Sequence, residues 1–153
     1  MTSKGSSVER GDANRRMASR TVSVEMARQL RAAGLEWRPS LFDFFHIPDR
    51  HLDDEVFVIA DLSVDVQRLG DGIAAITFNG AVEWSLDYIL QQDVVWLPTE
   101  SQLRELLGDR LISLGHSGDT WVCNAADEGG SRSYEASTAA DAYGSALLEH
   151  LSG

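Results

Sequence analysis

Histidine and acidic side chains gather in one short segment of the chain, from His46 to Glu55. Imidazole and carboxylate groups bind divalent metals and carry out acid–base catalysis, and the candidates for such a site are His46, Asp49 and His51. The two histidines are five residues apart and Pro48 prevents a helix between them, so their spacing matches no closed ligand pattern. The segment is therefore interpreted either as a metal-binding or hydrolase-like site or as a solvated polar turn between two strands, and the spacing favours the turn.

Nucleophilic catalysis has less support from the sequence. Cys123 is the only cysteine, and its apolar neighbours Trp121 and Val122 are typical of a small buried residue, not of a reactive thiolate. The segment Gly115–Asp119 contains histidine, serine and aspartate but lacks the GxSxG pattern of a nucleophile elbow. Neither GxxxxGK[ST] nor GxGxxG occurs, so we assign no catalytic residue and expect no cofactor.

The chain has four tryptophans, and aromatic side chains anchor both protein cores and protein interfaces. Trp84 and Trp96 lie in apolar segments, which is typical of core residues. Trp37 lies beside Arg38 in a proline-containing loop. Trp37 and Arg38 are therefore the predicted residues for contact with a partner.

Composition and charge restrict the class of protein. The 153 residues are 43% hydrophobic, which suits a folded domain, and 13 Lys and Arg against 24 Asp and Glu give a net charge of −11. Such an acidic chain is not expected to bind nucleic acid directly or an anionic membrane surface. The expected partner is another protein, and a homo-oligomer is an open alternative.

The amino-terminal segment differs from the rest of the chain. Residues 1–20 hold five basic and two acidic residues, a net +3, so the other 133 residues carry −14. Few apolar residues lie there, so we expect residues 1–21 to be a disordered basic tail and residues 22–153 to be a single domain. No apolar signal sequence follows the basic start and no apolar run is long enough to span a bilayer, so a cytoplasmic location is expected.

Two helices are marked by their capping residues. Apolar residues recur at helical spacing over Val24–Ala33, with Ser23 placed to cap the start and Gly34 to close the end in a left-handed conformation. A second helix is predicted over Thr99–Leu107, with Gln102 at the position of a capping box.

A third helix is predicted over Thr138–Leu151 because its apolar residues share one face. Thr138 and Asp141 resemble a capping box with aspartate in place of glutamate. Gly144 costs about 1 kcal/mol relative to alanine unless close packing requires it.

Alternating or β-branched segments predict the strands. They are Leu41–Ile47, Val56–Ala60, Val64–Leu69, Ile73–Phe78, Val94–Leu97, Leu111–His116, Thr120–Ala125 and Arg132–Ala136. The dipeptide Asn79-Gly80 favours a type I′ hairpin leading into residues 82–88, which also fit a short helix. Residues 127–131 are predicted to be a flexible loop. Helices do not alternate with strands, so the predicted class is α+β, a mainly antiparallel sheet with about three helices in the order α-β-β-β-β-α-β-β-α.

Several longer motifs carry a resemblance to known proteins. They are PDRHLDDEVF from Pro48, FNG from Phe78, EWSLD from Glu83 and WLPTESQLRELLG from Trp96. With them, the stretch from about Val24 to Leu151 resembles small uncharacterised bacterial proteins often labelled "pilus assembly protein CpaE". The ending YEASTAADAY, from Tyr134, also looks like small phage-type proteins of unknown role.

The resemblance implies no catalytic residue. True pilus-assembly proteins of that name are similar to ParA/MinD-type ATPases, which need a Gly-Lys loop for phosphate. The only lysine of this chain is Lys4, in the predicted tail, so no ATPase activity is expected.

The function most favoured by the sequence is a non-enzymatic, cytoplasmic protein-interaction module with an acidic surface. One alternative is a small hydrolase-like or metal-binding enzyme that uses the His46–Glu55 segment. Another is an acidic mimic of nucleic acid that sequesters a basic partner. The first interpretation expects the polar groups to lie apart on the surface and not to converge in a cavity.

Overall fold

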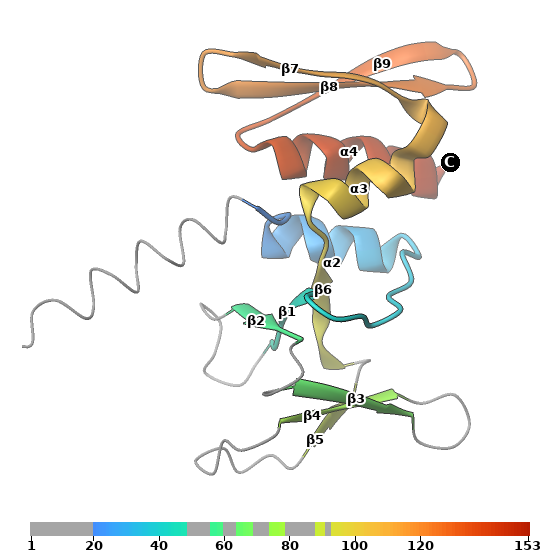
Figure 1. The fold of residues 1–153 in the computed structure, drawn as a ribbon. Coiled ribbons are helices and arrows are strands. Elements are labelled where there is room, and N and C mark those ends of the chain that lie inside the picture. Colours follow the sequence, from blue (N-terminus) through green and yellow to red (C-terminus); the bar gives the residue numbers. More distant parts are fainter. Residues whose placement is uncertain (1–19, 49–55, 60–63, 69–73, 79–87, 91–92) are drawn as a thin grey trace, which may run out of the picture. The chain divides into compact units, whose positions relative to one another are not determined.

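The computed structural model describes residues 20–48, 56–59, 64–68, 74–78, 88–90 and 93–153. The chain divides into two compact units, one made of the chain up to Leu35 together with Pro98–Gly153, the other of Glu36–Leu97. The described residues form three α-helices and three sheets, each of three antiparallel strands, which confirms the α+β class (Figure 1). Six strands lie between the first and second helices and three between the second and third. The predicted order had four and two, although the individually predicted segments number five, with residues 82–88 as a further candidate, and three.

The first helix of the first unit is α2 (Val24–Ala32), and its ends form as predicted. Ser23 caps the start, where its hydroxyl oxygen accepts a backbone N–H of the first turn at 3.2 Å. Gly34 has φ +101° at the other end, and the Leu35 N–H donates to the Leu30 carbonyl at 2.9 Å. This pattern is a Schellman ending, and the positive φ explains why glycine stands there.

The helix α3 (Glu100–Leu107) begins with the predicted capping box. The Thr99 hydroxyl accepts the Gln102 N–H at 3.3 Å, and the Gln102 side-chain oxygen accepts the Thr99 N–H at 3.0 Å. Thr99 also forms an antiparallel bridge with Thr21, which is buried. Thr21, the last residue of the predicted tail, is therefore part of the first unit's packed structure, while residues 1–19 lie outside the described part.

Three strands follow α3 and the short 3-10 helix η3 (Gly108–Arg110). They are β7 (Leu111–Ser117), β8 (Thr120–Asp127) and β9 (Gly130–Ala136), paired in that order. The pairing of Asp127 with Gly130 leaves a two-residue turn between β8 and β9, so the predicted flexible loop over residues 127–131 is wrong. A tight hairpin fits because Gly130 adopts φ +135°.

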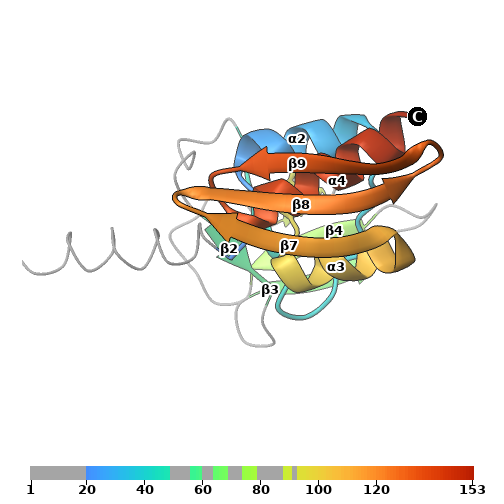
Figure 2. The same cartoon turned by 90° about the horizontal axis from the view of Figure 1, so that it is seen from above.

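Helix α4 (Ala139–Ser152) lies between this sheet and α2, and α3 lies beside it under the same face of the sheet (Figures 1 and 2). The Thr138 hydroxyl caps α4 by accepting the Asp141 N–H at 3.2 Å. The Asp141 carboxylate accepts the Ser23 N–H at 2.8 Å and so connects α4 to the start of α2. The core between the layers is formed by Val22, Ala27, Leu30, Leu103, Leu107, Cys123, Ala125, Ala139, Ala140, Ala142, Tyr143, Ala146 and Leu147.

The second unit contains two further sheets. In one, β1 (Phe44–His46) lies between β2 (Val56–Val58) and β6 (Val95–Leu97). Phe45 is fully buried, and its ring lies 5.6 Å from that of Phe57 on the neighbouring strand. The buried residues of β1 and β6 form the core that positions the site described below.

The other sheet has the order β3 (Val64–Arg68), β4 (Ala74–Phe78) and β5 (Tyr88–Leu90). Thr77 pairs with Tyr88, whereas a two-residue turn at Asn79-Gly80 would place residue 82 opposite Thr77. Residues 79–87, including the predicted turn, lie outside the described part of the chain. Among the helices that the structure describes, none combines the length and apolar character needed to cross a membrane.

Candidate functional site

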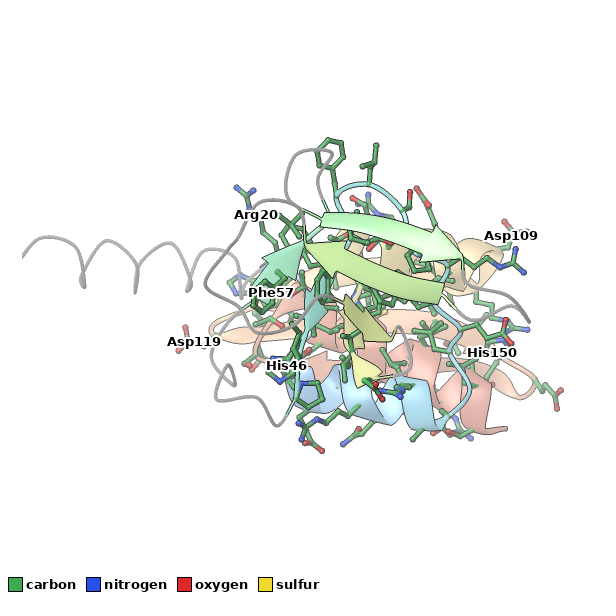
Figure 3. All side chains as sticks on the ribbon, turned by 90° about the horizontal axis from the view of Figure 1, so that it is seen from below. Arg20, His46, Phe57, Asp109, Asp119 and His150 are labelled. Carbon is green, nitrogen blue, oxygen red and sulfur yellow. The ribbon has the colours of Figure 1, made fainter. Side chains whose placement is uncertain are left out.

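His46 is placed in β1, opposite Val56 and Val95, and only 1% of its surface is exposed (Figure 3). The imidazole therefore belongs to the interior of the second unit and not to a solvated turn. The other two candidates, Asp49 and His51, lie outside the described residues. Within the described residues, no three His, Cys, Asp or Glu side chains are grouped as ligands for a metal ion. An enzyme that uses the His46–Glu55 segment stays a prediction.

Trp37 is half-buried and lies against other aromatic rings of the second unit. Its ring is nearly parallel to that of Trp96, at 9° and 6.5 Å, and lies 6.0 Å from the ring of Phe45. Its indole N–H donates to a carboxylate oxygen of Asp43 at 2.9 Å. Trp37 thus supports the neighbouring turn from inside, whereas Arg38 is exposed. A partner contact at these two residues stays a prediction.

The Asp43 side chain holds a tight turn in place. Asp43 is 3% exposed, and the carboxylate oxygen that accepts the Trp37 indole also accepts the Ser40 N–H at 2.9 Å. The backbone is fixed as well, because the Phe42 N–H donates to the Ile59 carbonyl at 2.7 Å and the Ile59 N–H donates to the Asp43 carbonyl at 2.9 Å. Two separate parts of the second unit, Trp37 and Ile59, therefore help to determine the conformation of this turn.

The turn displays two large apolar side chains to solvent. Phe42 is 72% exposed and Leu41 is 48% exposed. Phe42 also has φ +67°, the one positive φ at a non-glycine residue in the described chain. A bulky residue in this region costs about 1–3 kcal/mol and persists only where surrounding contacts impose it. We call residues 40–43 the Phe42 turn.

The sequence did not reveal the Phe42 turn. Leu41 and Phe42 belong to an apolar run that predicted a strand from Leu41, whereas β1 begins at Phe44. The available signal was Pro39-Ser40 followed by an aspartate three residues after the serine, which is typical of a side-chain-stabilised turn. Its exposed tip depends on the contact with Ile59, which local sequence does not indicate.

A second candidate site is a charged groove of about 530 Å³ in the first unit, between the end of α4, the β8–β9 hairpin and η3. Arg132 bridges two carboxylates there, Asp127 at 2.7 Å and Glu149 at 2.6 Å. Arg110 forms a hydrogen bond with the ring of His150, which Figure 3 shows near the end of α4. Charged groups therefore converge in this groove, and the expectation that they lie apart is wrong for these residues.

The charged groups of the groove mainly satisfy one another. Both carboxylates that reach Arg132 connect β9 to another element: Asp127 belongs to β8 and Glu149 to α4. Burial and the negative charge of Glu149 raise the pKa of Tyr134, which also lines the groove, so its phenol is neutral at physiological pH. The arrangement supports the packing of the hairpin on α4 and presents no activated nucleophile.

Cys123 is fully buried in β8, between Leu114 and Tyr134 of the adjacent strands, and burial raises the pKa of its thiol. We expect Ellman's reagent at pH 8 to modify the native thiol at least about 100-fold more slowly than the thiol of the urea-unfolded chain. Equal rates in the two states would contradict the buried position of Cys123.

The same thiol makes stability depend on pH. Its pKa is higher in the folded chain, so the unfolded thiol ionises first as pH rises. The contribution of Cys123 is therefore complete below about pH 8.5 and decreases above it by about 1.4 kcal/mol per pH unit until the folded thiol ionises. Cys123→Ala is expected to flatten the dependence in urea titrations between pH 7 and 9.5. Burial also raises the pKa of Tyr143, which adds to the slope only at higher pH.

The Phe42 turn and the charged groove are the two places where the described residues form a distinctive local geometry, and of the two only the turn exposes apolar side chains. No protein-family model, no curated protein and no solved structure matches this chain.

Proposed function

We propose that the chain is a protein-interaction module that inserts the side chain of Phe42 into an apolar pocket of a protein partner. The observation that carries this proposal is the combination of 72% exposure and a positive φ at one phenylalanine. Backbone strain of this kind concentrates at functional positions, and exposed aromatic side chains are typical anchors of interfaces. Burying the Phe42 side chain in a pocket contributes about 1.5–3 kcal/mol to binding.

The turn is rigid before a partner arrives, which favours binding. Asp43 fixes the loop through two hydrogen bonds, and backbone bonds to Ile59 fix both sides of Phe42. Trp37 packs on Trp96 and closes the turn from inside. Because the conformation is already set, little conformational entropy is lost when Phe42 is buried.

The charge of the chain indicates the partner's chemistry. The net charge is −11, and this field favours approach of a partner that surrounds its apolar pocket with basic residues. Association is expected to slow as salt is added, whereas dissociation depends on Phe42 and changes little. The alternative of an acidic nucleic-acid mimic stays a prediction, and it predicts binding that depends on salt but not on Phe42.

A photo-crosslinking amino acid at position 42 tests the proposal in cells that naturally produce the chain. We expect one defined adduct with a protein partner, and none with the same amino acid at Ser131, an exposed position of β9 that serves as the control. Identical adducts at both positions, or none at position 42, would contradict the proposal.

Two substitutions of Phe42 separate binding from folding. Phe42→Gly removes the side chain and also the φ strain, so the free energy of unfolding should stay unchanged or rise by about 1 kcal/mol while affinity for the crosslinked partner falls at least about tenfold. Phe42→Ala should lose the same affinity without relieving the strain. Calorimetric titration and urea unfolding measure the two effects. Full affinity in Phe42→Gly would show that another surface binds the partner.

A further inference from the structure

The two edges of the β7–β8–β9 sheet differ in charge. β8 is central, so β7 and β9 are the edge strands of this sheet in the described chain. β9 contains Arg132 and Glu135, whereas Leu111–Ser117 of β7 contains no Asp, Glu, Lys, Arg or Pro. Natural proteins protect exposed edges with such residues, because an unprotected edge pairs with another strand. β7 lacks this protection, and β9 has it.

The geometry of β7 suits pairing along most of its length. A bulge lies between Leu111 and Ser113, and beyond it the five residues Ser113–Ser117 run in unbroken register with β8. In an antiparallel ladder, alternate backbone groups point away from the neighbouring strand and are free to pair on the other side. Ile112, next to this regular stretch, is 56% exposed. β7 thus offers a backbone edge with an apolar side chain at one end.

The helix under β7 adds a second apolar contact. Figure 2 shows α3 beneath the β7 side of the sheet, and Leu106 of α3 is 43% exposed. A strand added beside β7 would lie near both elements. Pairing would therefore remove apolar surface from water in addition to forming backbone hydrogen bonds.

We propose that β7 pairs antiparallel with β7 of a second copy, which joins two three-stranded sheets into one of six strands. Two identical antiparallel strands are complementary about a two-fold axis. Residues 21–153 carry a charge of −14, so two copies repel one another over most of their surfaces. The uncharged β7 lets the backbones approach without placing carboxylates opposite each other. β7 has no carboxylate that would attract a basic partner, so a second copy of this chain is the partner that the edge favours.

Sedimentation equilibrium of the full chain tests the dimer. Ile112→Glu removes an apolar side chain at the end of the paired edge and adds a negative charge to each of two acidic copies there, so it should weaken dimerisation at least about tenfold. Ser131→Glu adds the same charge to exposed β9 and is the matched control, with an unchanged dimer expected. Rising salt should strengthen the wild-type dimer, because it screens the repulsion between acidic copies. A wild-type chain that is monomeric at the highest soluble concentration, or equal effects of the two substitutions, would overturn the proposal.

Disulfide crosslinking locates the interface independently of Ile112. In a Cys123→Ala background, single cysteines are introduced by Ser113→Cys, Gly115→Cys and Ser117→Cys, with Ser131→Cys as the control. The position nearest the two-fold axis should form a covalent dimer under mild oxidation, and the β9 position should not. A dimer that none of the β7 cysteines crosslinks, or that the β9 cysteine crosslinks equally, would assign the interface to another surface. Phe42→Ala should leave the dimer intact, so failure of either proposal is recognised separately.

Discussion

Gly144→Val is expected to lower the free energy of unfolding by about 3 kcal/mol or more, because the α2–α4 contact has no room for a side chain. A Cβ atom at position 144 would lie 2.7 Å from Cγ of Met26 and 3.3 Å from Cγ1 of Val22. Val22 is 2% exposed and cannot move into solvent. Valine adds two methyl groups to this contact, so the helices must separate. Urea unfolding followed by far-UV circular dichroism measures the loss.

A double-mutant cycle identifies the cause. Gly144→Ala alone gains about 1 kcal/mol of helix propensity but loses about 1–3 kcal/mol by overpacking, so a net loss is expected. In a Met26→Ala background the nearest obstruction is absent, and Gly144→Ala should become neutral or stabilising. If Gly144→Ala stabilises the otherwise unchanged chain by the full propensity gain, the close contact is not as the structure shows it.

Asp43→Ala is expected to cost about 2–4 kcal/mol and to release the Phe42 turn. The substitution leaves the Trp37 indole N–H and the Ser40 N–H without the carboxylate oxygen that accepts both of them. Once that oxygen is absent, only the backbone bonds to Ile59 oppose relief of the strain at φ +67°, and Phe42 should shift toward negative φ. Urea unfolding measures the stability, and backbone chemical shifts at residues 40–43 report the change in conformation.

Two neighbouring substitutions serve as controls for Asp43→Ala. Asp43→Asn keeps an acceptor oxygen and should lose less than half as much stability. Ser40→Ala keeps the backbone N–H that Asp43 binds and removes only an exposed hydroxyl, so its effect should stay within about 0.5 kcal/mol. If Asp43→Ala left the chemical shifts of the turn unchanged, the carboxylate would not be what holds Phe42 in its strained conformation.

Features that depend on neighbouring residues were predictable from the sequence. The capping box of Thr99 and Gln102 and the Schellman ending at Gly34 formed at the expected residues, because each is a hydrogen-bond pattern within one turn of helix. The α+β class followed from the order of such segments. The β8–β9 turn was wrongly predicted to be a flexible loop. Two adjacent glycines fit a flexible loop as well as they fit a tight turn that needs a positive φ, so local sequence does not distinguish the two.

The sites depend on residues that are distant in sequence. The charged groove joins Arg110 with His150 and Arg132 with Glu149, pairs that no local pattern reveals. The Phe42 turn depends on Ile59, which directly follows β2 and is 17 positions away in the sequence. Trp37, which the sequence predicted as a partner contact, lies in this region, but its packing inside the turn follows only from the fold.

The hydrogen bond from the Ser23 N–H to Asp141 joins residues separated by 118 positions, at the two ends of one packed body. During synthesis on the ribosome, α2 emerges well before α4, the helix it packs against. The whole Glu36–Leu97 unit lies between them in the sequence, so it is synthesised before α4. Until α4 has been synthesised, the apolar face of α2, with Ala27 and Leu30, has no helix to pack against and is exposed to aggregation.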